Sequence, residues 1–201
     1  MGEIIAIANQ KGGVAKTTTA VNLSACLAEM GKKVLLIDID PQGNASSGLG
    51  IDRFKLKQCI YDVLVNDTPA SKVILHTEID NLDILPATLQ LAGAEIELSN
   101  SISREIKLKN SLVSQLDEYD FIFIDCPPSL GLLTINALTA AEGVIVPIQC
   151  EYYALEGLSQ LLGNIELIQK HLNPELDVST ILLTMYDART NLSQEVAQEV
   201  R

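Results

Sequence analysis

Residues 3–18 read EIIAIANQKGGVAKTT, and this stretch decides the fold. The apolar run Glu3–Asn9 predicts a strand, the glycine-containing segment after it a loop, and the apolar spacing that follows a helix over Thr17–Met30. In that order, glycines let backbone N–H groups converge on a phosphate, and the helix adds the positive end of its dipole. The alternative, a lysine-containing turn before an ordinary helix, leaves that order unexplained. Residues Lys11–Thr18 are therefore predicted to form a phosphate loop.

The loop residues suggest distinct roles in binding a triphosphate and its metal. Lys16 is expected to lie along the β- and γ-phosphates, Thr17 to give its hydroxyl to Mg²⁺, and Thr18 to face the α-phosphate. The residues of this loop predicted to bind the nucleotide are Lys11, Gly12, Gly13, Val14, Ala15, Lys16, Thr17 and Thr18.

Two features depart from the common form G-x-x-x-x-G-K-[ST] of such loops. The first glycine is shifted from its position in that common form, and a second lysine, Lys11, stands at the front of the loop. Ala15 stands where a glycine usually precedes the lysine that is Lys16 here. A methyl group at that position is tolerated if φ is negative and costly if φ is positive. The loop is still expected to bind its ligand.

Short apolar runs alternate with helical stretches along the rest of the chain. Further strands are predicted at Lys33–Asp38, Leu82–Leu85, Phe121–Ile124, Val144–Ile148 and Ile181–Thr184. Lys33–Asp38 lacks polar alternation, so both of its faces are expected to be buried, as in a parallel sheet covered by helices. Strands separated by helices predict βαβ units with right-handed crossovers. The predicted fold is α/β, a mostly parallel β-sheet flanked by helices in one domain over residues 1–201, with the second strand beside the first.

Two more helices are predicted in the second half of the chain. Over Ile102–Leu116, one helical face would contain Ile102, Ile106, Leu112, Val113 and Leu116. Asn191–Arg201 reads as a helix with Asn191 or Ser193 as its cap. The sequence ends while that helix is running, which leads us to expect a truncated chain or missing elements.

Composition narrows the class of function. The formal net charge of −12 should repel bulk nucleic acid and anionic lipid, so any DNA contact must come from a local basic patch. The four cysteines form no C-x-x-C pair, and Cys26 and Cys126 lie in apolar runs where we expect small buried residues. Met1 leads directly into a strand, and no apolar stretch approaches the roughly 20 residues that span a bilayer. These features predict a protein of the reducing cytoplasm.

The phosphate loop Lys11–Thr18 resembles the deviant phosphate loop of the ParA/Soj/MinD group of ATPases. Three further blocks follow in order: DIDPQGN at 38–44, IDCPPSLG at 124–131 and EYYALEG at 151–157. Together they resemble the Soj/ParA chromosome-partitioning ATPases over essentially the whole chain. The resemblance implies a Mg²⁺-dependent ATPase that acts as a dimeric switch in chromosome or plasmid partitioning, is stimulated by a ParB-type DNA-binding partner, and lacks the family's C-terminal portion.

Acidic residues stand at the ends of two predicted strands. Asp125 ends a buried strand, where a carboxylate is expensive to desolvate and a nearby Mg²⁺ would offset that cost. We expect Asp125 to serve the metal through a bound water, and the alternative is a strand-terminal residue that caps the next turn. The resemblance implies that Asp40 positions or polarises the attacking water. Asp38 is the alternative, since it is embedded in the strand and could serve the metal shell or the structure.

Lys11 defines the group that the chain resembles. In relatives the matching lysine reaches across a nucleotide-sandwich dimer, where a cation delivered in trans neutralises charge that develops on the phosphoryl group. From the residues alone, a solvated loop lysine is an equal alternative. The resemblance implies catalytic roles for Lys11, Lys16 and Asp40, and an ATP-dependent homodimer.

The segment that begins at Thr184 bears on base choice and on DNA. Met185 replaces the lysine of a guanine-reading [NT]-K-x-D segment, which favours adenine and adds Met185 to the ATP-binding residues. Family members bind DNA non-specifically as ATP dimers through late basic residues, and Arg189 is the candidate phosphate contact. The alternative for Arg189 is a surface arginine paired with Asp187. Nucleoid association is implied but weakened, because the remaining basic patch would fall beyond Arg201.

Three other functions are weighed against this one. A MinD-like membrane-associated division-site ATPase would need a terminal amphipathic helix with a basic face, which these 201 residues lack. A metallocluster-carrying iron-protein relative is disfavoured by the arrangement of the cysteines. A truncated, non-hydrolysing nucleotide-binding module would bind without turnover, which turnover assays would reveal.

Overall fold

The computed structural model describes residues 2–151 and 154–200. Its centre is a seven-stranded sheet in the order β3-β4-β2-β5-β1-β6-β7. The strands are β1 (Glu3–Ile7), β2 (Val34–Asp38), β3 (Leu75–His76), β4 (Leu82–Leu85), β5 (Phe121–Asp125), β6 (Gly143–Gln149) and β7 (Asp177–Thr184). Neighbouring strands are parallel except that β3 runs antiparallel to β4 at one edge. The predicted mostly parallel α/β fold is confirmed.

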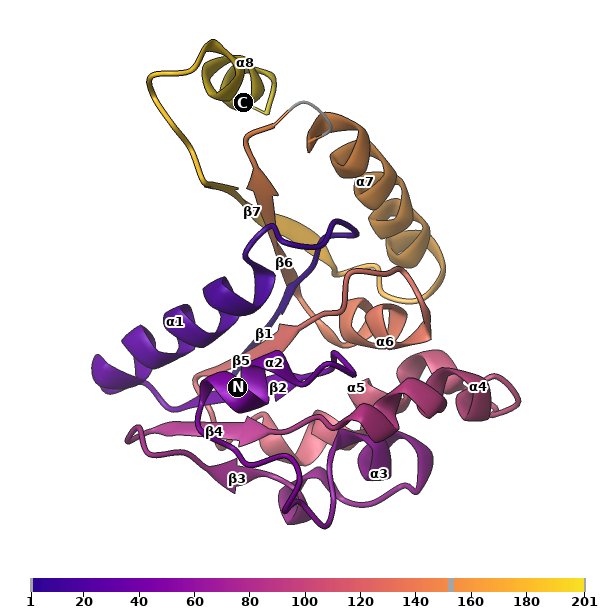
Figure 1. Ribbon diagram of the computed structural model, residues 1–201. Helices are drawn as coiled ribbons and strands as arrows, with labels where there is room; N and C mark the ends of the chain where they lie inside the picture. Colours follow the sequence, from indigo (N-terminus) through magenta and orange to yellow (C-terminus); the bar gives the residue numbers. More distant parts are fainter. Residues whose placement is uncertain (1, 152–153, 201) are drawn as a thin grey trace.

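Helices cover both faces of this sheet (Figure 1). The helices are α1 (Lys16–Glu29), α2 (Asn44–Gly48), α3 (Ile60–Val65), α4 (Ala94–Leu98), α5 (Lys107–Leu112), α6 (Leu132–Ala140), α7 (Ala154–His171) and α8 (Asn191–Glu199). Successive side chains of a strand point to opposite faces, and β1 therefore feeds two separate hydrophobic clusters. Ile5 and Ile7 pack with α1 and α2, whereas Ile4 and Ala6 pack in the larger cluster formed with α3 to α7.

The second strand does not lie beside the first, so that prediction is wrong. β5 lies between them, with Phe121 in register with both Glu3 of β1 and Val34 of β2. The crossover through α1 skips one position in the sheet, and a strand from much later in the chain fills it. Asp125, the last residue of β5, is consequently placed between the ends of β1 and β2.

The stretch Ile102–Leu116 is not one helix. It is divided into two 3₁₀ segments, Arg104–Ile106 and Val113–Gln115, on either side of α5. The predicted apolar face is also wrong at two positions, because the residues Ile102 and Val113 are 90% and 65% exposed. The physical reason is Asn136 of α6, whose amide donates to the Arg104 carbonyl and accepts from the Leu108 N–H, main-chain groups that a continuous helix would pair internally.

Helix α8 begins after Thr190, which has extended backbone angles and accepts a hydrogen bond from the Ser193 N–H. Neither predicted cap, Asn191 or Ser193, is therefore the cap. Arg201, the last residue of the predicted helix, lies outside the described residues. Among the described helices, none combines the length and the apolar character needed to cross a bilayer.

The two cysteines expected to be buried differ. Cys126 is buried, as predicted, whereas Cys26 is exposed. The buried positions of α1 are Lys16, Ala20, Ser24 and Ala28, which follow each other at intervals of one helical turn. Cys26 lies between two of these positions and therefore on the outer side of the helix, so the prediction for Cys26 is wrong.

Candidate nucleotide-binding site

The loop between β1 and α1 has the backbone of a phosphate cradle. Gly13 and Ala15 have φ angles of 77° and 69°. Within the described residues, no acceptor is paired with the N–H groups of residues 12–15, which leaves these donors available to an anion. The sequence left open whether φ at Ala15 is negative or positive. The structure shows a positive φ, which is the strained conformation for an alanine.

Two polar side chains attach this loop to the sheet. Asn9 accepts a hydrogen bond from the Lys11 N–H (3.0 Å) and donates its own amide to the Pro147 carbonyl of β6 (2.7 Å). On the far side, the Thr184 hydroxyl at the end of β7 donates to the Val14 carbonyl (3.2 Å). Sequence reasoning missed both anchors. A polar residue that closes an apolar strand, as Asn9 does, was the available signal.

Lys16 is buried at the first position of α1, and its ammonium donates to the Lys11 carbonyl (2.9 Å). Burial lowers the pKa of Lys16, while the negative charges of Asp125, Cys126 and Asp40 act in the opposite direction. The ammonium is thus held inside the loop, close to the acidic strand ends, where an anionic ligand would complete its set of partners.

Two carboxylates, Asp38 and Asp125, meet at the ends of β2 and β5, where they are in register and fully buried. Burial raises the pKa of Asp125 to about 7, and the nearby Asp38 adds to this, while the Thr17 hydroxyl and Lys16 oppose it. The Thr17 hydroxyl is near enough to lower the pKa of Asp125 as a donor would, but no described residue forms a hydrogen bond of ordinary geometry with either carboxylate oxygen. An unpartnered buried carboxylate beside a hydroxyl suits a hard cation such as Mg²⁺, so Thr17 and Asp125 fit the predicted metal site.

Asp38 has a different environment from Asp125. Its oxygens accept hydrogen bonds from the Ser46 hydroxyl (2.7 Å), the Ser46 N–H (2.8 Å) and the Asp40 N–H (3.2 Å). Burial nevertheless raises the pKa of Asp38 to about 6. Of the two roles considered for Asp38, this set of protein donors favours the structural one.

Asp40 and most of the loop residues line one cleft of about 340 Å³. Its lining comprises Gly12, Gly13, Ala15, Lys16, Thr17, Thr18, Asp40, Gln42, Asn44, Pro128 and Met185. Asp40 accepts a hydrogen bond from the Gln42 N–H (2.8 Å) in a tight turn that follows β2. The structure therefore brings together residues far apart in sequence, including Met185, and it adds Gln42, Asn44 and Pro128, which sequence reasoning did not single out.

Lys11 does not face this cleft. Its ammonium forms an ion pair with Glu151, two residues after β6, and both side chains are about one-third exposed. Glu151 opens the sequence block 151–157, of which Tyr152 and Tyr153 lie outside the described residues. The predicted role of Lys11 in a partner's site remains a prediction, and in this structure Glu151 holds its side chain.

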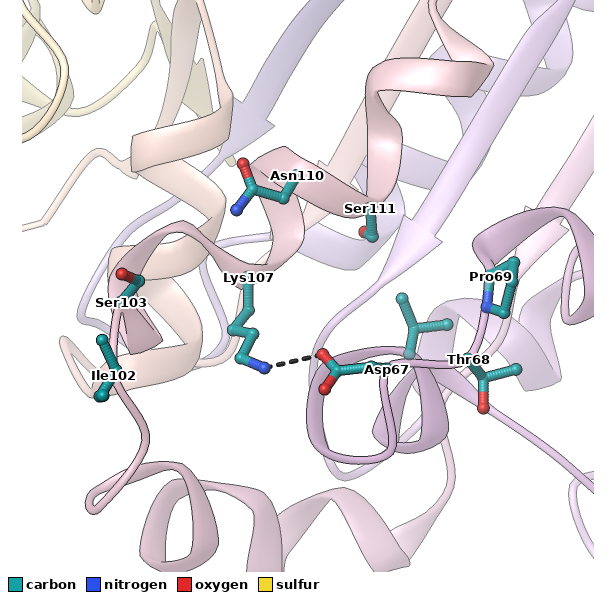
Figure 2. Close-up of a pocket in the computed structure, with 9 residues that line it drawn as sticks. Asp67, Thr68, Pro69, Ile102, Ser103, Lys107, Asn110 and Ser111 are labelled. Carbon is teal, nitrogen blue, oxygen red and sulfur yellow. Dashed lines mark hydrogen bonds and ion pairs between the residues drawn. The ribbon is translucent and has the colours of Figure 1, made fainter.

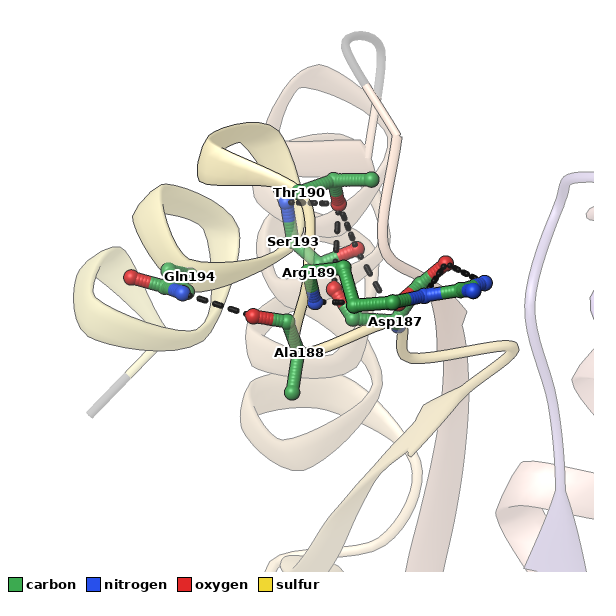
Figure 3. A network of polar contacts seen from close by, with 6 residues as sticks. All are labelled: Asp187, Ala188, Arg189, Thr190, Ser193 and Gln194. Carbon is green, nitrogen blue, oxygen red and sulfur yellow. Dashed lines mark hydrogen bonds and ion pairs between the residues drawn. The ribbon is translucent and has the colours of Figure 1, made fainter.

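Arg189 lies in the connection between β7 and α8 and is bound to Asp187 (Figure 3). The guanidinium donates from Nε to Asp187 Oδ1 (2.9 Å) and from Nη2 to Asp187 Oδ2 (2.7 Å). This is the arrangement named as the alternative to a DNA contact. Contact with DNA remains a prediction, and it would compete with this pairing.

A second cavity of about 380 Å³ lies between α3 and α5, and its lining includes Lys107 and Asp67, which form an ion pair (2.7 Å; Figure 2). None of the residues predicted to bind nucleotide, metal or DNA lines it. The cleft at the phosphate loop is therefore the site on which the sequence and the structure agree.

A mostly parallel sheet, a phosphate loop between strand β1 and helix α1, and acidic residues on the adjacent strand ends define a P-loop nucleoside triphosphatase. Comparison with known proteins agrees with this class. Residues 2–178 match the family model described as an AAA domain. The chain is 64% identical to the sporulation initiation inhibitor protein Soj of Bacillus subtilis, over all of this chain and 79% of that protein. It is 55% identical to the chromosome partitioning protein ParA of Myxococcus xanthus, over all of this chain and 71% of the relative.

Solved structures lead to the same family. A Mycobacterium smegmatis protein named cobyrinic acid a,c-diamide synthase, solved with ADP and magnesium, superposes with a TM-score of 0.95 at 46% identity, over all of this chain and 81% of the other. A plasmid partition protein from Borrelia burgdorferi superposes with a TM-score of 0.84 at 31% identity, over 98% and 84% of the two chains. The chain belongs to the Soj/ParA family of P-loop ATPases.

Proposed function

We propose that this protein binds ATP with Mg²⁺ in the cleft at the phosphate loop and hydrolyses it as a dimeric switch in chromosome or plasmid partitioning. The observation that carries the proposal is Asp125: its carboxylate is fully buried, no described residue forms a hydrogen bond of ordinary geometry with it, and it lies close to Lys16 in the phosphate loop. A magnesium–triphosphate complex supplies a cation that suits Asp125 together with an anion that suits Lys16 and the loop N–H groups.

Relatives support this choice of ligand. The M. smegmatis protein has been solved both with ADP and magnesium and with an ATP analogue and magnesium, at 46% and 45% identity. A putative plasmid partition protein of B. burgdorferi, at 30% identity, has been solved with AMPPNP. Two of the most similar relatives are named for chromosome partitioning.

Each residue has a distinct task in the proposed reaction. The N–H groups of residues 12–15 and the Lys16 ammonium would bind the phosphates, and Thr17 and Asp125 would hold the metal, Asp125 through a water. When bound there, Mg²⁺ would neutralise charge on the phosphate oxygens. Asp40 accepts a hydrogen bond from the attacking water and orients it toward the γ-phosphorus. Lys11, once released from Glu151, supplies a cation to the phosphates bound by the partner protomer. Because each site needs the lysine of the other protomer, ATP turnover depends on dimerisation.

The wider role follows from the family. We place the ATP-bound dimer on the nucleoid in the cytoplasm, with turnover stimulated by a ParB-type DNA-binding partner. Arg189 contributes to non-specific DNA contact after release from Asp187. In a protein of net charge −12, such contact depends on a few local cations and should be strongly weakened by salt.

Calorimetric titration with MgATP tests the binding step. The substitution Lys16→Ala removes the buried ammonium and is expected to weaken binding at least about hundredfold, as loss of a charge-assisted contact to phosphate requires. Lys32→Ala is the matched control, since Lys32 is an exposed lysine just beyond α1. Unchanged affinity in Lys16→Ala would refute the assignment. Wild-type protein that binds ATP but releases no phosphate, with or without a partner, would instead support a non-hydrolysing module.

A further inference from the structure

Ser46 occupies a fully buried position in α2, directly after the turn that carries Asp40. Its hydroxyl donates to Asp38 Oδ2 (2.7 Å), and its N–H donates to the same oxygen (2.8 Å). The hydroxyl also accepts a hydrogen bond from the Ala87 N–H (3.0 Å), in the segment after β4. One side chain thus connects the end of β2, the first helix after it, and the end of the neighbouring strand.

The other oxygen of Asp38 extends this connection to the proposed water-orienting residue. Asp38 Oδ1 accepts a hydrogen bond from the Asp40 N–H (3.2 Å). The Asp40 carbonyl in turn accepts from the Gly43 N–H (2.8 Å), which closes the turn. The orientation of the Asp38 carboxylate therefore fixes the main chain at Asp40, and Ser46 fixes that orientation through two donors on one oxygen.

The turn at residues 40–43 is also restricted by its packing against the segment that follows β4. Gly43 has a φ of 60°, and a Cβ built on it would lie 2.9 Å from the Ala87 carbonyl oxygen. The backbone of the turn and the backbone at Ala87 are thus in close contact, and the N–H of Ala87 is the group that Ser46 accepts from. Loss of the Ser46 hydroxyl would leave this N–H without its acceptor and the Asp38 carboxylate with one donor fewer.

We propose that Ser46 is a positioning residue for ATP hydrolysis, because its hydroxyl orients Asp38 and thereby the main chain at Asp40. This inference rests on the proposed function, in which Asp40 orients the attacking water. It assigns to Ser46 an effect on turnover rather than on nucleotide binding, since Ser46 does not line the cleft. A displacement of about 1 Å in an orienting group can reduce a rate by up to about hundredfold while binding contacts remain intact.

The neighbouring residue provides a matched control. Ser47 lies in the same short helix, but its hydroxyl donates only to the Gly43 carbonyl (3.1 Å). The Ser47 N–H donates to that carbonyl as well, so the contact persists without the side chain. The substitutions Ser46→Ala and Ser47→Ala remove the same atom from adjacent residues, and only the first removes a contact to Asp38.

The experiment measures steady-state phosphate release over a range of MgATP concentrations, together with ATP affinity by calorimetry. Ser46→Ala is expected to lower kcat about tenfold with an ATP Kd within about twofold of wild type. Ser46→Thr, which keeps the hydroxyl, should recover most of the loss, and Ser47→Ala should match wild type. Ser46→Cys, which keeps the size and weakens the hydrogen bonds, replaces Ser46→Ala if thermal melting shows that the latter does not fold.

Hydrogen–deuterium exchange of a peptide that contains residues 38–48 gives a readout independent of turnover. The Asp40 amide should exchange about tenfold faster in Ser46→Ala than in Ser47→Ala, because the Asp38 acceptor is no longer held in place. If wild-type protein is active, any one of three results would overturn the positioning role. These are equal kcat in Ser46→Ala and Ser47→Ala, equal exchange of the Asp40 amide in the two variants, or a loss of ATP affinity in Ser46→Ala that parallels its loss of kcat. Wild-type protein that binds ATP without turnover would instead defeat the proposed hydrolysis.

Discussion

At the scale of single residues, Ala15 is the position where the phosphate loop departs most from an unstrained backbone. Its φ of 69° lies in the left-handed region, which costs an alanine roughly 1–2 kcal/mol. Glycine removes that strain, but it also increases the conformational entropy of the unfolded chain, which lowers stability by roughly 0.4–1 kcal/mol. We therefore expect Ala15→Gly to raise the free energy of unfolding of the nucleotide-free protein by about 0.5 kcal/mol, measured by urea denaturation.

Ala25, in the interior of α1, provides the control for that experiment. Its backbone is helical, so Ala25→Gly should lower the free energy of unfolding by about 1 kcal/mol. Equal destabilisation by the two substitutions would show that the alanine in the loop is not strained.

The buried carboxylate Asp125 predicts a dependence of stability on pH. Its folded-state pKa of about 7 exceeds the ordinary value of 3.8, so the folded protein binds more protons between these values than the unfolded chain does. The free energy of unfolding contributed by this group therefore falls as pH rises from about 4 to about 7 and stays low above that. Asp125→Asn, which carries no charge at any pH, should be more stable than wild type at pH 8, by on the order of 2 kcal/mol.

Denaturation of the two proteins without metal or nucleotide checks this prediction. The difference should shrink towards zero at about pH 4 and below, where the folded protein keeps Asp125 protonated and the unfolded chain begins to protonate it as well. A difference that is the same at both pH values would mean that the charge of Asp125 is not the cause.

The sequence revealed the site residues whose partners are close in the chain. Lys16, Thr17 and Thr18 could be recognised because strand, loop and helix are contiguous. The contacts of Asn9 with Pro147 and of Glu151 with Lys11 could not be predicted, because they form only when distant strands meet in the sheet. The φ of Ala15 was likewise inaccessible, since the residue type allows both signs.

At the scale of elements, the start of α8 offers a direct comparison between what the sequence favours and what the structure shows. Thr190 is the N-cap, and its side chain accepts from the Ser193 N–H (3.4 Å). Thr190→Ala should therefore lower the free energy of unfolding by about 1 kcal/mol, as loss of an N-cap usually does. Hydrogen exchange should also show faster opening of residues 191–199.

Asn191→Ala is the matched variant, because the sequence equally allowed Asn191 as the cap. It should change stability by less than about 0.5 kcal/mol, as expected for an exposed position. Reversal of the two effects would place the cap where the sequence pattern first suggested.

The predicted strands were found within a few residues, because each is a compact apolar run. Helices were harder to predict, and Ile102–Leu116 shows why. Leu108 and Leu112 have the one-turn spacing of a helix, and both are buried in α5. On the N-terminal side of α5, Asn136 binds the Arg104 carbonyl and the Leu108 N–H in place of the helical pairing, and the position of Asn136 relative to this segment depends on the tertiary fold.

At the scale of the whole molecule, Asp40→Ala separates nucleotide binding from turnover. The substitution removes the group that orients water and leaves the phosphate contacts in place, so we expect an ATP-bound dimer that persists. Light scattering after size exclusion should show a dimer with ATP and a monomer with ADP. Phosphate release should fall at least about hundredfold, the scale of a lost general-base or orienting group.

Asp52→Ala controls for loss of an acidic residue near the site, since Asp52 is exposed and paired with Lys55. It should behave as wild type in both assays. Monomeric elution of Asp40→Ala with ATP, together with normal phosphate release, would contradict both the role of Asp40 and the dimeric switch.

The place of β5 between β1 and β2 has a consequence for how the polypeptide acquires its structure during synthesis. The first two strands emerge early from the ribosome, yet each must wait for Phe121–Asp125 before its central neighbour exists. Contacts between such distant segments form slowly, because a long loop must close first. The nascent chain therefore exposes two apolar strand edges until more than half of it has been made, and this interval is when chaperones would be needed most.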